Sequence, residues 1–132
     1  MKVYVAGKWE DRDRVSKIMR ILEGMGEEIT YDWTGHKYKD EAYPQQYCAD
    51  DVQGVKDADL YLGIFVADYH YRGALVEMGI ALGVGIPIWL LGDKQDGCIF
   101  TNHPSVTKFV TWTELVDAIV EFGTSVESDI EL

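Results

Sequence analysis

The feature that most constrains the fold is a pair of apolar runs that flank a helical pattern in residues 59–92, DLYLGIFVADYHYRGALVEMGIALGVGIPIWLLG. The first run, Leu60–Val66, has the composition of a strand buried on both faces, and Ile86–Leu91 has the same character. Between them, apolar residues that include Leu75 and Met78 recur at helical spacing. A strand, a helix and a second strand in so short a stretch form a βαβ unit, which requires parallel strands and a right-handed crossover.

The remaining segments continue this alternation of strands and helices. The predicted elements are, in order, a strand at Val3–Ala6, a helix that starts near Asp11 or Asp13 and ends at Gly24 or Gly26, a strand at Glu28–Trp33, a loop at Thr34–Pro44, a helix at Gln45–Asp57, a loop at Asp93–Ser105, a strand at Lys108–Thr111 and a last helix capped by Thr111 and Glu114. This order predicts an α/β fold in one domain. We expect a three-layer, doubly wound sheet, flavodoxin-like or Rossmann-like, with five mostly parallel strands.

Length and charge set limits on the partners of the protein. With 132 residues, 47% of them hydrophobic and 27% charged, the chain has the balance of one soluble globular domain. We expect residues 1–124 to form this domain and residues 125–132 to be an acidic C-terminal tail, with fraying from Gly123 onward. The net charge of −11 argues against nucleic acid as a partner. No apolar run approaches the roughly 20 residues that span a membrane.

Several common kinds of site are excluded by the motifs that the sequence lacks. GxGxxG does not follow the first strand, and neither GxxxxGK[ST] nor GxSxG occurs. Cys48 and Cys98 have no metal or redox spacing, and His36, His70 and His103 are scattered. We therefore expect no metal and no cofactor. Two unpaired cysteines and the lack of a signal-peptide pattern favour a cytoplasmic location.

The predicted topology indicates where a ligand would bind. In doubly wound sheets, ligands lie at the carboxyl ends of the strands, where the strand order reverses. This rule selects the loops Gly7–Glu10 and Asp68–Gly73. The polar residues that could carry chemistry near these loops are carboxylates: Asp50, Asp51, Asp59, Asp68 and Glu77.

Glu77 is the carboxylate that is hardest to explain as part of an ordinary surface. It lies in the second turn of a predicted helix that is otherwise apolar, between Val76 and Met78. A carboxylate near a helix N-terminus is stabilised in its ionised form, and an ionised carboxylate in a crevice can be a nucleophile toward an anomeric carbon. A position on the solvent-facing side of the helix is the alternative, and the residues alone leave both open.

Three segments together resemble the nucleoside 2-deoxyribosyltransferase superfamily, which includes 2′-deoxynucleoside 5′-monophosphate N-glycosidases. They are VYVAGKW, YCADDVQGVKDADLYLGIF and GALVEMGIALGVGIP, and the resemblance covers roughly residues 2–112. Its most specific part is the helix core from Glu77 to Ala81. The resemblance implies that Glu77 attacks C1′ of the deoxyribose, expels the base and forms a covalent glycosyl ester.

The resemblance also implies roles for residues outside that helix. Asp51 matches an aspartate that handles the proton of the departing base, and we prefer it to its neighbour Asp50 by register. Asn102 matches an asparagine that enters the site from a neighbouring subunit, which implies a homodimer or a higher homo-oligomer. Tyr4 and Trp9 match aromatic positions around the base and sugar.

The sequence departs from the family pattern six residues before Glu77. Transferases tend to have an Asp there and the monophosphate hydrolases a Ser, whereas this chain has Tyr71, followed by Arg72 and Gly73. The Ser-rich phosphate loop is therefore absent, although Arg72 could bind a phosphate, and Asp68 and Gly7 complete the predicted loops.

Three functions follow from this combination. The favoured one is transfer of 2-deoxyribose from one base to another, with small-molecule deoxynucleosides and free bases as partners. The nearest alternative uses water as the acceptor and cleaves a deoxynucleoside or its 5′-monophosphate. A non-catalytic domain that binds or senses a nucleotide is the third.

Overall fold

The computed structural model describes residues 1–36, 43–68, 70–94 and 97–131, without the side chains of residues 43–44 and 123–131. Five strands form one sheet in the order β2-β1-β3-β4-β5, and every neighbouring pair is parallel. The strands are β1 (Lys2–Ala6), β2 (Glu28–Ile29), β3 (Leu60–Ile64), β4 (Ile88–Leu91) and β5 (Val106–Phe109). The predicted doubly wound α/β fold is confirmed.

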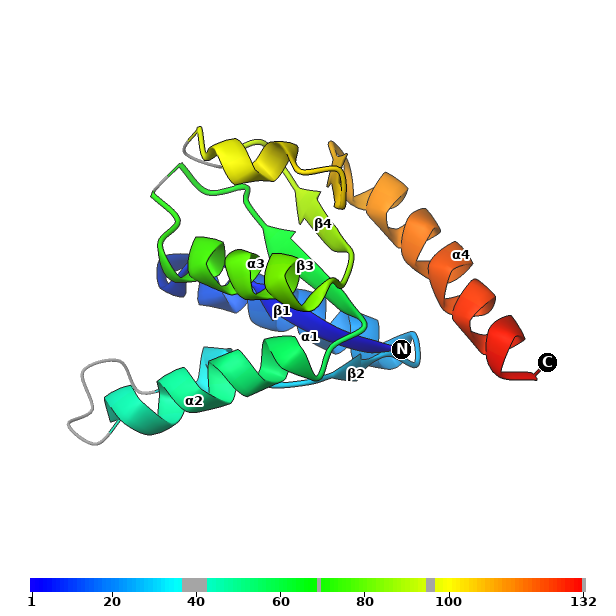
Figure 1. The fold of residues 1–132 in the computed structure, drawn as a ribbon, viewed down its shortest axis with the longest axis horizontal. Helices are drawn as coiled ribbons and strands as arrows, with labels where there is room; N and C mark the ends of the chain where they lie inside the picture. Colours follow the sequence, from blue (N-terminus) through cyan, green and yellow to red (C-terminus); the bar gives the residue numbers. More distant parts are fainter. Residues whose placement is uncertain (37–42, 69, 95–96, 132) are drawn as a thin grey trace.

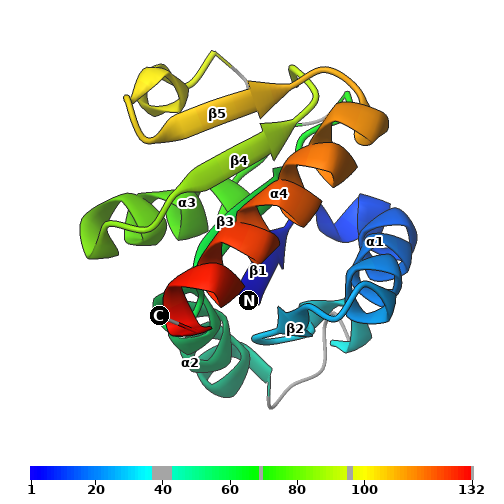
Figure 2. The ribbon, with the colours of Figure 1, turned by 90° about the vertical axis from the view of Figure 1, so that its right-hand side faces the viewer.

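Four helices cover the two faces of this sheet (Figures 1 and 2). They are α1 (Arg12–Gly24), α2 (Tyr43–Lys56), α3 (Gly73–Val84) and α4 (Trp112–Glu131), with short 3-10 helices η1 (Trp9–Asp11), η2 (Trp33–Gly35) and η3 (Ile99–Asn102). Helices α2 and α3 pack side by side on one face, and α1 and α4 lie on the other. Among the described residues, no helix combines the length and the apolarity that crossing a membrane requires.

The side chains of the central strands form the core because they alternate between two covered faces. On the side of α2 and α3, the rings of Tyr4 and Tyr61 stack with their centroids 6.3 Å apart. On the opposite side, Trp89 contacts the ring of Phe109 on β5 and that of Phe122 on α4, with centroids 5.2 and 5.3 Å away. Every residue of β3 and β4 is buried, as the two apolar runs predict.

The second strand is shorter than predicted. Only Glu28 and Ile29 pair with β1, and the chain then leaves the sheet to form η2. The cause is Trp33, whose buried indole Nε1–H donates to the carbonyl oxygen of Val5 at 2.7 Å. The side chain of Asp32 caps the new turn by accepting from the Thr34 amide at 2.9 Å.

Other element boundaries also differ from the prediction. Helix α2 begins at Tyr43, because Pro44 is tolerated in the first turn of a helix. The predicted loop before it lies largely outside the described residues. Strand β5 starts at Val106 rather than Lys108. Helix α4 continues through Glu131, past the point where we expected fraying, and the expected Thr111 cap accepts from the Glu114 amide at 3.2 Å.

Candidate active site

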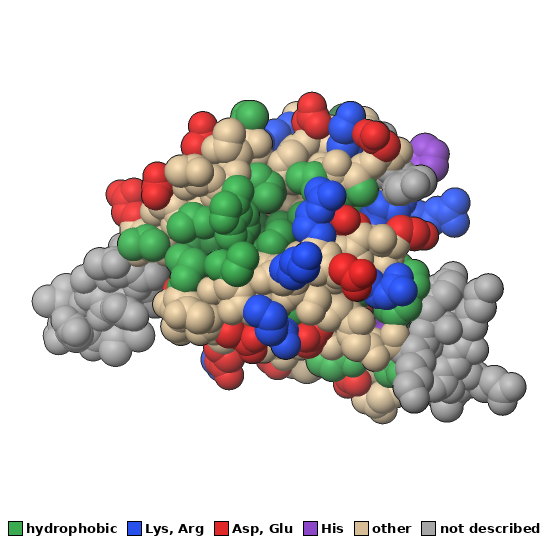
Figure 3. Space-filling model, turned by 180° about the vertical axis from the view of Figure 1, so that it is seen from behind, with side chains coloured by type: hydrophobic (Ala, Val, Ile, Leu, Met, Phe, Trp, Pro, Cys, Tyr) green, Lys and Arg blue, Asp and Glu red, His purple; other side chains and the backbone are tan. Residues whose placement is uncertain are grey.

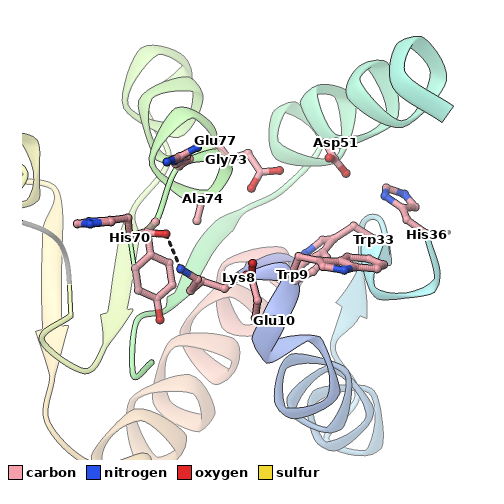
Figure 4. Close-up of a pocket in the computed structure, with 13 residues that line it drawn as sticks. Lys8, Trp9, Glu10, Trp33, His36, Asp51, His70, Gly73, Ala74 and Glu77 are labelled. Atoms are coloured by element: carbon pink, nitrogen blue, oxygen red, sulfur yellow. Dashed lines mark hydrogen bonds between the residues drawn. The ribbon is translucent and has the colours of Figure 1, made fainter. Parts of the chain in front are cut away.

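A cavity of about 640 Å³ opens at the carboxyl ends of β1 and β3, where the strand order reverses. Its walls come from the segment after β1, from η2, from α2 and from the loop and first turns of α3 (Figure 4). The lining residues are Gly7, Lys8, Trp9, Glu10, Trp33, His36, Asp51, His70, Tyr71, Arg72, Gly73, Ala74 and Glu77. The cavity therefore lies where the topology predicts a ligand.

Glu77 points into this cavity from the second turn of α3 (Figure 4). The helix is fixed from its inner side, where Ala74 and Met78 are buried and the Tyr61 hydroxyl donates to the carbonyl oxygen of Ala74 at 2.5 Å. Burial raises the pKa of Glu77 to about 8; a hydrogen bond from Tyr4 opposes this rise, and the charge of Asp51 adds to it. Glu77 is thus a rigidly placed carboxyl group and not a surface residue.

Tyr4 on β1 fixes the carboxyl group of Glu77, because its hydroxyl donates a hydrogen bond to Glu77 Oε2. The ring lies on β1, is fully buried and does not line the cavity. Helix α2 approaches this ring closely at Gly54, where a Cβ atom would lie 3.0 Å from Tyr4 Cδ1 and 2.8 Å from Tyr31 Cβ. Tyr4 thus contacts the carboxylate of Glu77, and its expected contact with base and sugar stays a prediction.

Asp51 faces the cavity from α2, on the same side as Glu77 (Figure 4). Burial, reinforced by the neighbouring charge of Asp50, raises the pKa of Asp51 to about 6, while the nearby Tyr4 hydroxyl opposes the rise. Its buried Oδ1 accepts no hydrogen bond from the described part of the chain. Asp50, by contrast, accepts from Gln46 Nε2 at 2.8 Å and does not line the cavity. The structure thus brings Asp51 rather than Asp50 to Glu77.

Basic side chains form another part of the cavity wall. Lys8 Nζ donates to the carbonyl oxygen of His70 at 2.6 Å and lies 5.4 Å from the centroid of the Tyr71 ring (Figure 4). Tyr71 is itself nearly inaccessible, and its hydroxyl accepts from the Ala67 amide at 2.9 Å. Arg72 lines the cavity beside them. A locally cationic wall is therefore present in a chain whose net charge is −11.

Aromatic side chains form the wall opposite the two carboxyl groups (Figure 4). Trp9 is covered by the Arg12 guanidinium, 4.4 Å from the ring centroid. Trp33 lies next to it, fixed by its bond to β1. His36 stacks on Tyr47 of α2 at 3.7 Å with nearly parallel rings. The indoles of Trp9 and Trp33 thus lie across the cavity from Glu77 and Asp51 (Figure 4).

Trp33 and His36 were not predicted as site residues. The sequence pattern puts Trp33 at the end of a predicted strand, and His36 is one of three histidines scattered along the chain. Asp32, Thr34 and Gly35 are residue types that favour turns, and they are the signal in the sequence that could have indicated a bend there. Such a bend brings the side chains of Trp33 and His36 to the cavity.

Besides Tyr4, two predicted site residues do not line the cavity. Asp68 is 82% exposed and forms an ion pair with Lys94, Nζ to Oδ1 3.0 Å, which holds it outside. Asn102 lies on η3, where its Oδ1 accepts from Lys108 Nζ at 3.3 Å. Its expected role requires a second subunit. Gly7, Trp9, Tyr71, Arg72 and Gly73 do line the cavity.

The donor groups of the site suit acid–base and nucleophilic chemistry. Within the described ranges, no group of three or more His, Cys, Asp or Glu side chains could hold a metal ion. With pKa values near 8 and 6, Glu77 and Asp51 together hold one proton at neutral pH. A carboxylate and a carboxylic acid that face one cavity can attack an electrophilic carbon and protonate a leaving group.

The fold of the chain is similar to two solved structures. One is a CMP N-glycosidase from Clostridium botulinum, with 22% sequence identity and a TM-score of 0.64 over 85% of this chain and 90% of that one. The other is a 2-deoxyribosyltransferase from Bacillus psychrosaccharolyticus, with 21% identity and a TM-score of 0.68 over 87% and 90%. A comparison with curated protein sequences finds no significant match.

The sequence itself matches a protein family over nearly its whole length. Residues 3–128 match the nucleoside 2-deoxyribosyltransferase family, a span that contains the whole sheet except Lys2 and every residue that lines the cavity. The two solved structures with a similar fold are named as an N-glycosidase and a 2-deoxyribosyltransferase. The chain therefore belongs to the nucleoside 2-deoxyribosyltransferase family.

Proposed function

We propose that the protein cleaves the N-glycosidic bond of a 2′-deoxynucleoside and transfers the sugar to another base. One observation carries this proposal: the carboxyl group of Glu77 is fixed by the Tyr4 hydroxyl and faces the cavity beside Asp51. A binding protein gains nothing from two half-buried carboxyl groups whose pKa values are both raised, whereas a nucleophile and an acid need this arrangement.

The reaction uses the single proton of the carboxyl pair. A Glu77 oxygen forms a bond to C1′ while the bond from C1′ to the base nitrogen breaks, and its electron pair leaves with the base. Asp51 donates the proton that neutralises the departing base. A second base then attacks C1′, releases Glu77 and returns a proton to Asp51, so the enzyme ends in its starting state.

Tyr4 contributes by stabilising the ionised form of Glu77. Burial makes the carboxylate of Glu77 unfavourable, and the hydrogen bond from the Tyr4 hydroxyl is the interaction that lowers its pKa. The hydroxyl remains a donor at working pH, since burial raises the pKa of Tyr4 well above its ordinary value. With pKa values of about 8 and 6, the shared proton lies mainly on Glu77, and the hydrogen bond from Tyr4 lowers the cost of reaching the minor state with Glu77 ionised and the proton on Asp51, which is the state that reacts.

The cationic wall favours a second candidate, cleavage of a 2′-deoxynucleoside 5′-monophosphate with water as acceptor. Lys8 and Arg72 line the same cavity as Glu77, and Lys8 is held by the His70 carbonyl. Cations so placed would attract a phosphate on the sugar. Glu10 lies in the same wall and disfavours an anion, so base transfer from the unphosphorylated nucleoside stays the first candidate.

Product analysis distinguishes the two. The protein is incubated with each of the four deoxynucleosides and each 5′-monophosphate, with and without adenine, and the products are separated by chromatography. Base transfer predicts a new deoxyadenosine product that requires adenine. Hydrolysis predicts free base and sugar, or sugar phosphate, whether or not adenine is present. No cleavage of any of the eight compounds would contradict both candidates.

A further inference from the structure

A polar cluster lies at one end of the cavity, between the turn η2 and helix α2. His36, which lines the cavity, is hydrogen-bonded through Nε2 to the hydroxyl of Tyr31, 2.5 Å away. The His36 ring also stacks on Tyr47, with the ring centroids 3.7 Å apart and an interplanar angle of 3°. Tyr31 itself does not line the cavity. One nitrogen and one face of the imidazole are therefore held by side chains of the same chain.

Tyr31 is held in turn by the backbone of α2. A Cβ atom at Gly54 would lie only 2.8 Å from Tyr31 Cβ, so the helix packs directly against this side chain. Next to it, the hydroxyl of Thr30 donates to the carbonyl oxygen of Gly54 at 2.7 Å. Because both contacts involve the backbone of a helix, the Tyr31 hydroxyl is a fixed point for the imidazole.

The charge of Asp50 decides which group donates in the contact between Tyr31 and His36. Burial, followed by the nearby charges of Asp50 and Asp51, raises the pKa of Tyr31 to about 12. Burial also lowers the pKa of His36, so both groups are neutral near pH 7. The Asp50 carboxylate can only accept, and it attracts the single proton of the Tyr31 hydroxyl. The Tyr31 oxygen then accepts from Nε2–H, and His36 Nδ1 is left as an acceptor.

His36 lies at the end of the cavity that a base would occupy. Figure 4 shows Asp51 between Glu77 and His36, with Lys8 and His70 on the other side of Glu77. In the proposed reaction Glu77 attacks C1′ and Asp51 protonates the base, so the base extends from Glu77 past Asp51 toward His36. The group at C4 of a pyrimidine points directly away from the sugar, and the group at C6 of a purine lies on the ring distal to it.

We propose that Tyr31 is a positioning residue for base recognition: it orients His36 so that Nδ1 accepts a hydrogen bond from an exocyclic amino group of the base. The inference rests on the function proposed above and names its substrate class, the deoxynucleosides of cytosine and adenine. Uracil and hypoxanthine carry an oxygen at the same position, which has no proton to donate to Nδ1. No residue in the described ranges hydrogen-bonds to Nδ1, so this acceptor is available to a ligand.

The competing explanation is that His36 only joins η2 to α2. In that case the hydroxyl of Tyr31 would contribute to the stability of the fold but not to the choice of base. The ratio of two dissociation constants separates these explanations. A loss of stability lowers the amount of folded protein for both ligands equally, whereas a change of the acceptor at Nδ1 alters the ratio.

Isothermal titration calorimetry of the full chain tests the proposal, with Glu77→Gln as the background so that the ligands are not cleaved. Two matched pairs differ in an amino or an oxo group at the recognised position: deoxycytidine with deoxyuridine, and deoxyadenosine with deoxyinosine. We expect each amino compound to bind at least about tenfold more tightly than its oxo partner, because a buried acceptor is left unpaired by the oxo group.

Adding Tyr31→Phe should reduce this ratio to less than about threefold, and His36→Ala should do the same. The two changes together should lower it no further than His36→Ala alone, because Tyr31 acts through His36. If Tyr31→Phe does not fold by circular dichroism, Asp50→Ala replaces it. This variant removes the carboxylate that attracts the Tyr31 proton, so the hydroxyl can donate to Nε2 and the ratio should fall as well.

A control variant comes from the opposite side of the molecule. Figure 3 shows the side that faces away from the viewer in Figure 1, where apolar side chains gather next to Lys, Arg, Asp and Glu side chains. Helix α4 covers the face of the sheet opposite α2, and its Val120 is 55% exposed. Val120→Ala should leave the ratio within each pair unchanged.

Several results would overturn the inference. They are equal binding within each pair, tighter binding of the oxo compounds, and a ratio that neither Tyr31→Phe nor His36→Ala reduces. Any of these leaves the proposed function standing if the product analysis shows cleavage. Failure of all four deoxynucleosides to bind would contradict the inference and the proposed function together.

Discussion

Glu77→Gln should stabilise the fold while it removes the reactive group. Burial raises the pKa of Glu77 from 4.5 to about 8. Between these values the folded protein retains a proton that the unfolded chain has released, so the free energy of unfolding falls as pH rises, by up to about 1.4 kcal/mol per unit. At pH 7 the full effect is on the order of 3 kcal/mol, and the partial solvent exposure of Glu77 reduces it to roughly 1–3 kcal/mol.

Urea unfolding at two pH values measures this gain. The amide of the variant carries no charge and still accepts from the Tyr4 hydroxyl. We therefore expect Glu77→Gln to be more stable than wild type by roughly 1–3 kcal/mol near pH 7.5 and by less than about 1 kcal/mol near pH 5. Glu121→Gln, which removes an exposed carboxylate from α4, is the matched control and should show neither the gain nor its pH dependence. An equal gain at both pH values, or a loss near pH 7.5, would show that Glu77 is not held in a buried, proton-retaining state.

Further predictions follow from the same geometry. The pH profile of kcat/KM should be bell-shaped with limbs near pH 6 and pH 8, because the carboxyl pair reacts only with one proton; a flat profile across this range would contradict it. Asp51→Asn should lower turnover in steady-state assays by about 10²–10⁴-fold and Asp50→Asn by much less. Equal losses in the two variants would show that the assignment of the proton donor to Asp51 rather than Asp50 is wrong. Gly54→Ala should destabilise the fold by about 1–3 kcal/mol in urea unfolding, since its methyl group would collide with Tyr31 Cβ and crowd the Tyr4 ring, and an unchanged midpoint would refute these contacts. Lys8→Ala should raise KM for 5′-monophosphates but not for nucleosides if the cationic wall binds phosphate.

The parts of the fold that the sequence predicts are those set by local patterns. The runs at Leu60–Val66 and Ile86–Leu91 predict β3 and β4 because strands buried on both faces have few alternatives to continuous apolar residues. The Thr111 cap predicts the start of α4 for the same local reason. The early end of β2 was missed, because it depends on an indole that bonds to a carbonyl 28 residues earlier in the chain.

The site shows the same division. Glu77 is conspicuous in the sequence because its helix has no other charge, but its hydrogen bond to Tyr4 spans 73 residues and follows only from the pairing of β1 with β3. In the sequence, nothing distinguishes Gly54 from an ordinary helix residue, and only the structure shows that it packs against the ring of Tyr4. Tyr71 illustrates the opposite case, since its departure from the family pattern is visible at once, whereas its role as a buried support of the loop is not.

The measurement that tests the central claim most directly is the mass of the intact protein after reaction with a 2-fluoro-substituted deoxynucleoside. The fluorine slows breakdown of the sugar ester, so the intermediate should accumulate. We predict an increase equal to one fluorinated deoxyribosyl group, located by digestion to the peptide that contains Glu77, and no such increase in Glu77→Gln. If the sugar is found on another residue, or if Glu77→Gln still cleaves and transfers the sugar, Glu77 is not the nucleophile and the account is wrong.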